Sequence, residues 1–112
     1  MAQIERLKKN TDFKNVYKKG KSFADKFVVI YLCKNFSNVT RVGFTASKKV
    51  GNSVKRNRAR RLMKESFRNN SRDIKIGYDI VFIARVAIND ADYYDVEKSI
   101  RRVMKKSKIY MN

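Results

Sequence analysis

The amino-acid sequence predicts an α+β protein, a two-layer α/β sandwich in which helices pack against a central mixed sheet. The first reason is the order of the periodic segments, which is helix, strand, strand, helix, strand, helix (α-β-β-α-β-α). The second is the strand, helix and strand in residues 41–88, which imply a parallel βαβ crossover, right-handed by default. A length of 112 residues without a linker or repeat predicts a single domain, residues 1–112.

A first helix is predicted over residues 10–20. Either Asn10 or Thr11 can cap its start, and Gly20 stands where a left-handed residue commonly ends a helix. The apolar residues of this segment recur at i, i+3 and i+4 and form one stripe, made of Phe13, Val16 and Tyr17. Terminal segments are commonly mobile, so residues 1–9 are predicted to be flexible.

Two strands follow the first helix. Residues 27–33 and 41–47 are rich in β-branched and aromatic side chains, and a turn region, 36–40, separates them. We expect these strands to pair as an antiparallel hairpin. Gly43 inside the second strand indicates a close approach by another part of the chain. In the first of these strands, Tyr31 lies on the face opposite Val28, Ile30 and Leu32.

The segment 53–69 has a helical period, and Ser53 can cap its start. Its apolar side carries Ala59, Leu62, Met63, Ser66 and Phe67. Its opposite flank carries Arg60, Arg61, Lys64 and Arg68, with Arg56 at the border. A nearly continuous apolar run predicts a central strand over residues 78–88, buried on both faces. The last helix is predicted to begin at Asp90 or Asp92.

The charge of the chain indicates a polyanionic partner. The 28 Lys and Arg residues against 10 acidic residues give a net charge of +18, spread over the whole length. RNA, DNA and an anionic membrane surface are the candidates. A membrane span is not expected, since the longest apolar run is far below the roughly 20 residues that a membrane helix needs. The single cysteine, Cys33, and the absence of a signal peptide predict a cytoplasmic protein.

The chain offers no evident catalytic group of its own. It contains no histidine, which excludes a Ser-His-Asp or Cys-His arrangement and the usual zinc sites. Phosphate-binding glycine motifs are also missing. The single acidic cluster is expected to stabilise the start of the last helix rather than to act as acid and base. Its members are Asp90, Asp92, Asp95 and Glu97.

The basic helix and the aromatic residues are the candidate nucleic-acid contacts. Lys48 and Lys49 precede a helix N-terminus, where backbone N–H groups favour phosphate oxygens. Arginine can bind a phosphate with two parallel hydrogen bonds, and Asn57 can bond to a phosphate, a 2′-OH or a base edge. The alternative is a solvated basic face that serves solubility. Phe13 and Tyr17 are core residues by spacing, but with Tyr31 they could line a groove that stacks bases.

The stretch VGFTASKKVGNSVKRNRARRLMKESFR, residues 42–68, resembles the core motif of the bacterial ribonuclease P protein subunit family. The family signature is SKK-x-GN-x-V followed by an Arg-Asn-Arg helix. Here the signature covers Ser47–Val54 and Arg56–Arg58. Residues 10–22 resemble the first helix of the family, and residues 77–88 resemble its strand that ends in Ala-Arg. The resemblance therefore covers nearly the whole chain.

The resemblance implies a protein that assists a ribozyme. The RNA subunit, with Mg²⁺, removes the 5′ leader of precursor tRNA, and the protein supplies no catalytic residue. The residues implied to face the catalytic RNA are Lys48, Lys49, Arg56, Asn57, Arg58, Arg60, Arg61, Lys64 and Arg68. Those implied to line a leader cleft between the first helix and the sheet are Phe13, Tyr17 and Tyr31. Both ribonuclease P RNA and precursor tRNA are the implied partners, without DNA or membrane.

The resemblance also bears on the fold and on the alternatives. It implies a ribosomal protein S5 domain 2-like fold with a left-handed crossover, against the right-handed default. It implies an additional short strand, for which residues 20–26 or 46–50 are candidates. A structural RNA-binding protein, such as a small ribosomal protein, is the main alternative function. A nuclease that acts alone is disfavoured, because the chain has no histidine and no evident carboxylate cluster for a metal.

Overall fold

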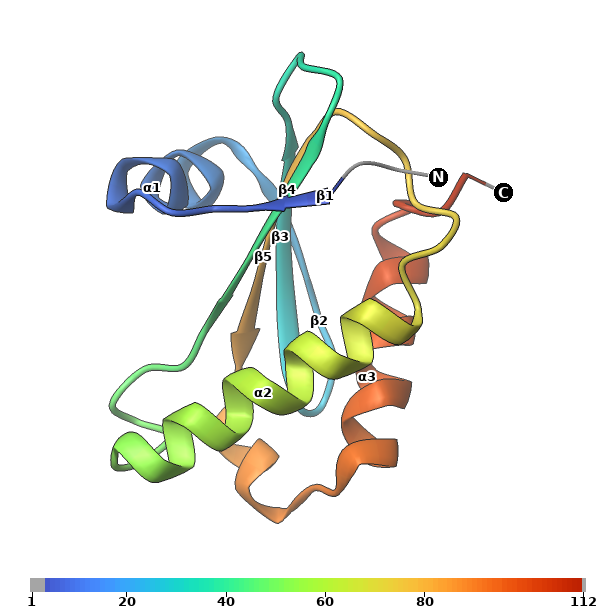
Figure 1. Cartoon of the computed structure of the whole chain (residues 1–112). Coiled ribbons are helices and arrows are strands. Elements are labelled where there is room, and N and C mark those ends of the chain that lie inside the picture. The colour runs from blue at the N-terminus through green and yellow to red at the C-terminus, as the bar shows by residue number, and fades with distance from the viewer. Residues whose placement is uncertain (1–3, 112) are drawn as a thin grey trace.

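The computed structural model describes residues 4–111, which form a mixed sheet and three α-helices (Figure 1). In chain order the elements are β1 (Ile4–Arg6), α1 (Asn10–Lys19), β2 (Lys21–Ala24), β3 (Val28–Lys34), β4 (Thr40–Thr45), α2 (Ser53–Asn69), β5 (Tyr78–Ala84), the 3₁₀ helix η1 (Val86–Asp90) and α3 (Tyr93–Lys106). The sheet has five strands in the order β1-β4-β5-β3-β2. The predicted α+β class and the mixed sheet are confirmed.

β5 lies at the centre of the sheet, parallel to β4 and antiparallel to β3. The predicted hairpin between residues 27–33 and 41–47 is therefore wrong. A strand that is apolar on both faces is most stable with a neighbour on each edge, so β5 lies between the two strands that precede it in sequence. The predicted parallel crossover is confirmed as β4–α2–β5, and its left-handed sense stays a prediction. The strand ends at Ala84, not at residue 88, because residues 86–90 form η1.

Helices cover both faces of the sheet, as Figure 1 shows with the sheet nearly edge-on. Alternate residues of β5 point to opposite faces. Ile80 and Phe82 belong to the main core beneath α2 and α3, which form the helical layer of the predicted sandwich. Val81 belongs to a smaller cluster beneath α1, together with Leu7 and Val16. α1 therefore adds a partial layer on the other face.

Two short edge strands complete the sheet. β2 lies within residues 20–26, one of the two predicted places, and pairs with β3. The other predicted place, residues 46–50, contains a turn instead of a strand. β1 falls in the segment predicted to be flexible and pairs in parallel with β4. Its side chains are exposed, so backbone hydrogen bonds rather than apolar burial hold it, and hydropathy did not indicate it.

The N-termini of α2 and α3 are capped by side chains. Asn52 is the N-cap of α2, and its Oδ1 accepts a hydrogen bond from the Lys55 N–H at 3.0 Å. The predicted cap, Ser53, is instead the first helical residue. Asp92 caps α3 and forms a capping box with Asp95, in which each side chain bonds to the backbone of the other. Two members of the acidic cluster, Asp92 and Asp95, thus have the structural role that the sequence indicated.

The ends of α1 differ from the prediction. Its N-cap is Lys9, which makes no side-chain capping bond, so neither Asn10 nor Thr11 caps the helix. Gly20 follows the helix with φ −82° and ψ 161°, an extended rather than a left-handed conformation. A Cβ at Gly20 would lie 2.5 Å from the carbonyl oxygen of Val16. The position therefore needs glycine for space and not for a positive φ.

Candidate nucleic-acid interface

α2 has one buried face and one charged face, as its periodicity predicts. The buried residues are Ala59, Met63, Ser66 and Phe67, and Leu62 is half-buried beside them. The ring of Phe67 packs against those of Phe44 and Phe82, with centroids 5.9 and 5.5 Å away. Because this aromatic cluster fixes the helix on the sheet, the opposite face holds its basic side chains at defined places on the surface.

The predicted basic residues differ in their exposure. The exposed members of the predicted RNA-facing set, which includes Asn57, are Lys48, Lys49, Asn57, Arg61, Lys64 and Arg68. Arg56, Arg58 and Arg60 are half-buried. Arg60 donates a hydrogen bond to Asn57 Oδ1, and Arg68 forms an exposed ion pair with Glu65 at 3.2 Å. Exposed pairs of this kind contribute little to stability, so a phosphate can compete for Arg68.

Arg58 forms hydrogen bonds within the protein. Its Nη1 donates to the carbonyl oxygen of Ile88 at 3.2 Å, and its Nη2 donates to that of Ala91 at 2.5 Å. These bonds tie α2 to η1 and to the residue that follows it. The sequence grouped Arg58 with the RNA-facing arginines, because charge pattern alone does not show which guanidinium has partners within the fold.

The turn that carries Lys48 and Lys49 is held in place from two sides. Within the turn, the Val50 N–H donates to the Ser47 carbonyl oxygen at 3.0 Å. From η1, the Asn89 side chain donates to the Val50 carbonyl oxygen at 2.6 Å. Val50 itself is buried. The two exposed lysines therefore stand on a defined turn directly before the N-terminus of α2, where backbone N–H groups favour an anion.

The three predicted aromatic residues gather between α1 and the sheet, and we call this place the aromatic cleft (Phe13, Tyr17 and Tyr31). The rings of Tyr17 and Tyr31 meet edge to face, with centroids 5.2 Å apart. Tyr17 is 38% exposed, and Phe13 and Tyr31 are half-buried. Phe13 and Tyr17 line a pocket of about 420 Å³ with Asn10, Lys14 and Thr45, three residues that sequence reasoning did not select.

Gly43 allows α1 to lie this close to the sheet. A Cβ at this position would lie 2.5 Å from Cζ of the Phe13 ring, so the ring would have to shift to admit any other residue. The predicted close approach at Gly43 is confirmed, and the approaching group is a residue of the aromatic cleft.

An ion-pair network fixes the other side of α1. Arg41 of β4 donates to Asp79 of β5 from Nε at 2.8 Å and from Nη2 at 2.6 Å. Its Nη1 lies 3.5 Å from the carboxylate of Asp12 in α1. The hydrogen bonds with Asp79, which is buried, raise the pKa of Arg41 above its ordinary value. This arginine stays charged and joins α1 to the two central strands.

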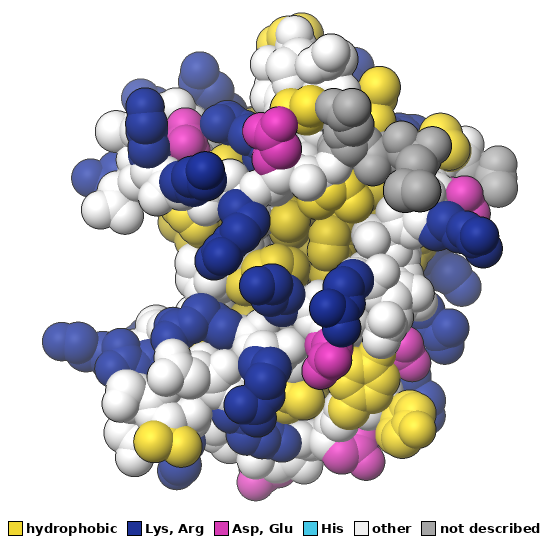
Figure 2. Space-filling view, viewed as in Figure 1, with side chains coloured by type: hydrophobic (Ala, Val, Ile, Leu, Met, Phe, Trp, Pro, Cys, Tyr) yellow, Lys and Arg dark blue, Asp and Glu magenta, His cyan; other side chains and the backbone are white. Residues whose placement is uncertain are grey.

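The basic face of α2 and the aromatic cleft adjoin each other. A pocket of about 230 Å³ lies between them, with Arg60, Arg61 and Lys64 on one side and Phe13 on the other. Arg6 of β1 also lines it, and sequence reasoning gave this residue no defined place because β1 was not predicted. Figure 2 shows a hollow between α1 and α2 with an apolar base and lysine and arginine around it.

The described residues 4–111 hold neither a group of metal ligands nor a helix that could span a membrane. Within residues 4–111, no three His, Cys, Asp or Glu side chains gather in a way that could hold a metal ion. Glu97 accepts hydrogen bonds from Tyr93 and Asn70, at 3.2 and 3.1 Å, and belongs to the packing of α2 against α3. No helix of the described residues is long and apolar enough to cross a membrane.

The family model of Ribonuclease P matches residues 1–108 of this chain. The chain belongs to the ribonuclease P protein family. The ribonuclease P protein component of Clostridioides difficile (strain 630) is 56% identical over 104 residues, which cover 92% of this chain and 91% of the relative. That of Clostridium botulinum (strain Loch Maree / Type A3) is 50% identical over 106 residues, 94% of this chain and 96% of the relative.

Solved structures of this family have the same fold. The Staphylococcus aureus RNase P protein matches with a TM-score of 0.85 and 38% identity, over 94% of this chain and 96% of that one. The RNase P protein from Thermotoga maritima matches with a TM-score of 0.81 and 31% identity, over 91% of this chain and 96% of that one. The resemblance read from the Arg-Asn-Arg helix is confirmed.

Proposed function

We propose that this chain, a member of the ribonuclease P protein family, serves as the protein subunit of ribonuclease P in tRNA 5′ maturation. It binds the catalytic RNA through the basic face of α2 and the turn before it, and it holds the 5′ leader of precursor tRNA in the aromatic cleft. Besides the family, one observation carries the proposal. A rigidly anchored basic helix and an exposed aromatic cleft adjoin across one pocket, so that one protein can hold two RNAs side by side.

The basic face acts through phosphates. Arg61, Lys64 and Arg68 are exposed and can each neutralise a phosphate, which releases condensed counterions and makes binding depend on salt. Lys48 and Lys49 add charge at the N-terminus of α2. Because the helix is anchored by Phe67 and Arg58, the backbone that carries these charges is in place before the RNA arrives, and no ordering of the helix opposes binding.

The aromatic cleft acts through bases. A single-stranded leader has unstacked bases, which aromatic side chains can stack on without regard to sequence. Tyr17 presents 38% of its surface, and its edge-to-face contact with Tyr31 keeps both rings in position. Mature tRNA has no leader, so the cleft distinguishes substrate from product.

Cleavage itself is assigned to the RNA. Mg²⁺ prefers oxygen ligands such as phosphates, and we place it on the RNA in the proposal. The protein raises the local concentration of substrate at the catalytic RNA and offsets the repulsion between the two polyanions. This role places the chain in the cytoplasm, where precursor tRNA is made.

Reconstitution with a bacterial ribonuclease P RNA tests the proposal. At low Mg²⁺, the wild-type protein should increase precursor tRNA cleavage, and no increase would refute it. The substitution Tyr31→Ala should weaken binding of leader-bearing tRNA by about 5- to 150-fold, which corresponds to about 1–3 kcal/mol for one stacked base, and spare mature tRNA. Tyr94→Ala is the matched control, since Tyr94 is exposed on α3. Equal losses for both RNAs would contradict the leader cleft.

A further inference from the structure

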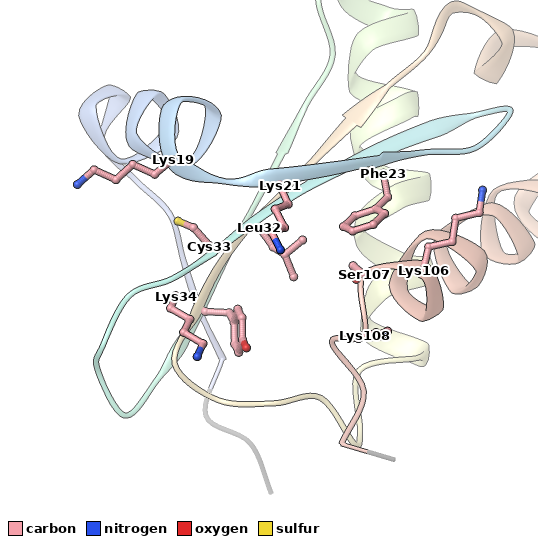
Figure 3. A pocket seen from close by; sticks show the side chains of 10 residues that line it. Lys19, Lys21, Phe23, Leu32, Cys33, Lys34, Lys106, Ser107 and Lys108 are labelled. Atoms are coloured by element: carbon pink, nitrogen blue, oxygen red, sulfur yellow. The ribbon is translucent and has the colours of Figure 1, made fainter.

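A second basic concavity lies at the β2 edge of the sheet, between the end of α1 and the end of α3, and we call it the lysine pocket. Its volume is about 570 Å³ (Figure 3). Five lysines line it, namely Lys19, Lys21, Lys34, Lys106 and Lys108. Four separate segments supply them, so the fold and not a run of sequence brings these charges together. None of the five belongs to the basic face of α2.

Most of this charge is not neutralised by the protein. Among residues 4–111, only Lys106 of the five pairs with a carboxylate, that of Asp25 at 3.8 Å. Lys19 and Lys106 lie in the last turns of helices, where cations stabilise the helix dipole. That explanation does not extend to Lys21, Lys34 and Lys108. Their convergence on one pocket leaves a positive potential that fits an anionic ligand.

The pocket also has aromatic walls. Phe23 of β2 and Tyr78 of β5 line it, and both are half-buried against the main core. Figure 3 shows Phe23 and Leu32 facing the end of α3, with Lys21 beside them. Cations together with exposed ring surface are the combination that binds single-stranded nucleic acid. Lysine is a point charge on a flexible stem, so five lysines can follow phosphates without imposing one geometry.

The lysine pocket is a neighbour of the aromatic cleft. Tyr31 and Cys33 are alternate residues of β3 on the face that α1 covers, and side chains at this spacing are about 7 Å apart. Tyr31 contacts Tyr17 of the cleft, whereas Cys33 lines the lysine pocket. Lys21, Leu32 and Lys34 point to the other face of the sheet, toward the end of α3, so the lysine pocket extends from Cys33 round the β2 edge. A strand that leaves the cleft along β3 therefore reaches these lysines by turning round that edge.

We propose that the lysine pocket binds the part of the leader that extends beyond the aromatic cleft, with lysines on its phosphates and Phe23 and Tyr78 against its bases. This inference rests on the proposed function, since it needs a leader in the cleft. It assigns the protein a second leader site, reached only by long leaders and distinct from the surface that binds the catalytic RNA.

A triple variant tests this site in the reconstituted holoenzyme. Lys21→Gln, Lys34→Gln and Lys108→Gln are combined and assayed on a precursor whose leader ends within the cleft and on one several nucleotides longer. For the long leader, the slope of log affinity against log salt should fall by about 2, since each single-strand phosphate contributes about 0.7. The ratio of wild-type to variant affinity for the long-leader precursor should then fall about 20-fold between about 50 and 200 mM salt. The short leader should bind equally well to both proteins.

A second triple variant serves as the charge-matched control. Lys26→Gln, Lys98→Gln and Arg101→Gln remove three exposed charges that do not line the pocket. An equal loss in this control, an equal loss on the short leader, or weakened binding of the catalytic RNA alone would overturn the inference.

The one cysteine of the chain gives a readout that needs no lysine substitution. Burial raises the pKa of the Cys33 thiol, so alkylation with iodoacetamide is slow and its rate can be followed at mildly alkaline pH. The long leader should protect Cys33 more than the short leader or mature tRNA does. Equal rates with both leaders would refute the inference alone, whereas a Tyr31→Ala protein that binds leaders normally would refute the proposed function as well.

Discussion

The basic face of α2 contains two kinds of arginine, and substitution should separate them. Arg58 donates to the carbonyl oxygens of Ile88 and Ala91, whereas Arg61 and Lys64 point to solvent. Hydrogen bonds from a charged group contribute about 1.5–3 kcal/mol each, and partial exposure places this pair at the lower end. Arg58→Gln should therefore lower the free energy of unfolding by about 2–3 kcal/mol. The double substitution Arg61→Gln, Lys64→Gln should change it by less than about 0.5 kcal/mol per site.

RNA binding should respond in the opposite order. Each phosphate contact on a duplex contributes about 0.9 to the slope of log affinity against log salt, so removing Arg61 and Lys64 should lower the slope by about 1.8. Between about 50 and 200 mM salt, this difference amounts to about 12-fold in affinity for the catalytic RNA. Arg58→Gln should change the slope by less than one contact, since both terminal nitrogens of Arg58 already donate to carbonyl oxygens of the protein.

Two measurements check this contrast. Urea unfolding gives the stability of each variant, and filter binding of ribonuclease P RNA across a salt series gives the slope. A fully stable Arg58→Gln protein whose salt slope falls as far as that of the double variant would refute the reasoning. It would mean that Arg58 leaves its carbonyl partners to bind RNA.

Two further predictions concern the scaffold. Arg102 and Ser99 donate to Asp25, and the bonds from Arg102 are the main reason that its pKa lies at about 2, below the ordinary 3.8. The ionised carboxylate therefore stabilises the fold above pH 4. Because Arg102 is half-exposed to solvent, the stabilisation is only about 1–2 kcal/mol, and it is lost as the pH falls to 2. Asp25→Asn should show that deficit in urea unfolding at pH 7 and not near pH 2; a deficit independent of pH would contradict the assignment. Gly43→Ala should crowd the Phe13 ring and lower the free energy of unfolding by about 1–3 kcal/mol, measured by thermal unfolding. It should also weaken leader binding. Adding Phe13→Leu to this variant should restore its stability. An unchanged melting temperature in Gly43→Ala would show that α1 can move away freely.

The sequence predicted most helices and strands correctly, because each depends on the spacing of apolar residues within its own segment. The helix over residues 53–69 has the predicted bounds, since its apolar period lies within the segment, although its N-cap is Asn52 and not the predicted Ser53. The central position of β5 followed from its apolar composition on both faces. The predicted hairpin between β3 and β4 was wrong because β5, which is buried on both faces, pairs with one of these strands on each of its edges. β1 was missed since backbone pairing, and not side-chain burial, holds it.

The candidate sites divide in the same way. The sequence by itself determined that the chain is a small, strongly basic α+β protein of the ribonuclease P family, because charge, periodicity and the Arg-Asn-Arg motif are properties of neighbouring residues. Only the tertiary structure decided that Arg58 anchors α2, that Gly43 admits Phe13, and that lysines from four segments converge on one pocket. These facts depend on contacts between residues distant in sequence, and such contacts produce no repeating pattern of residue types along the chain.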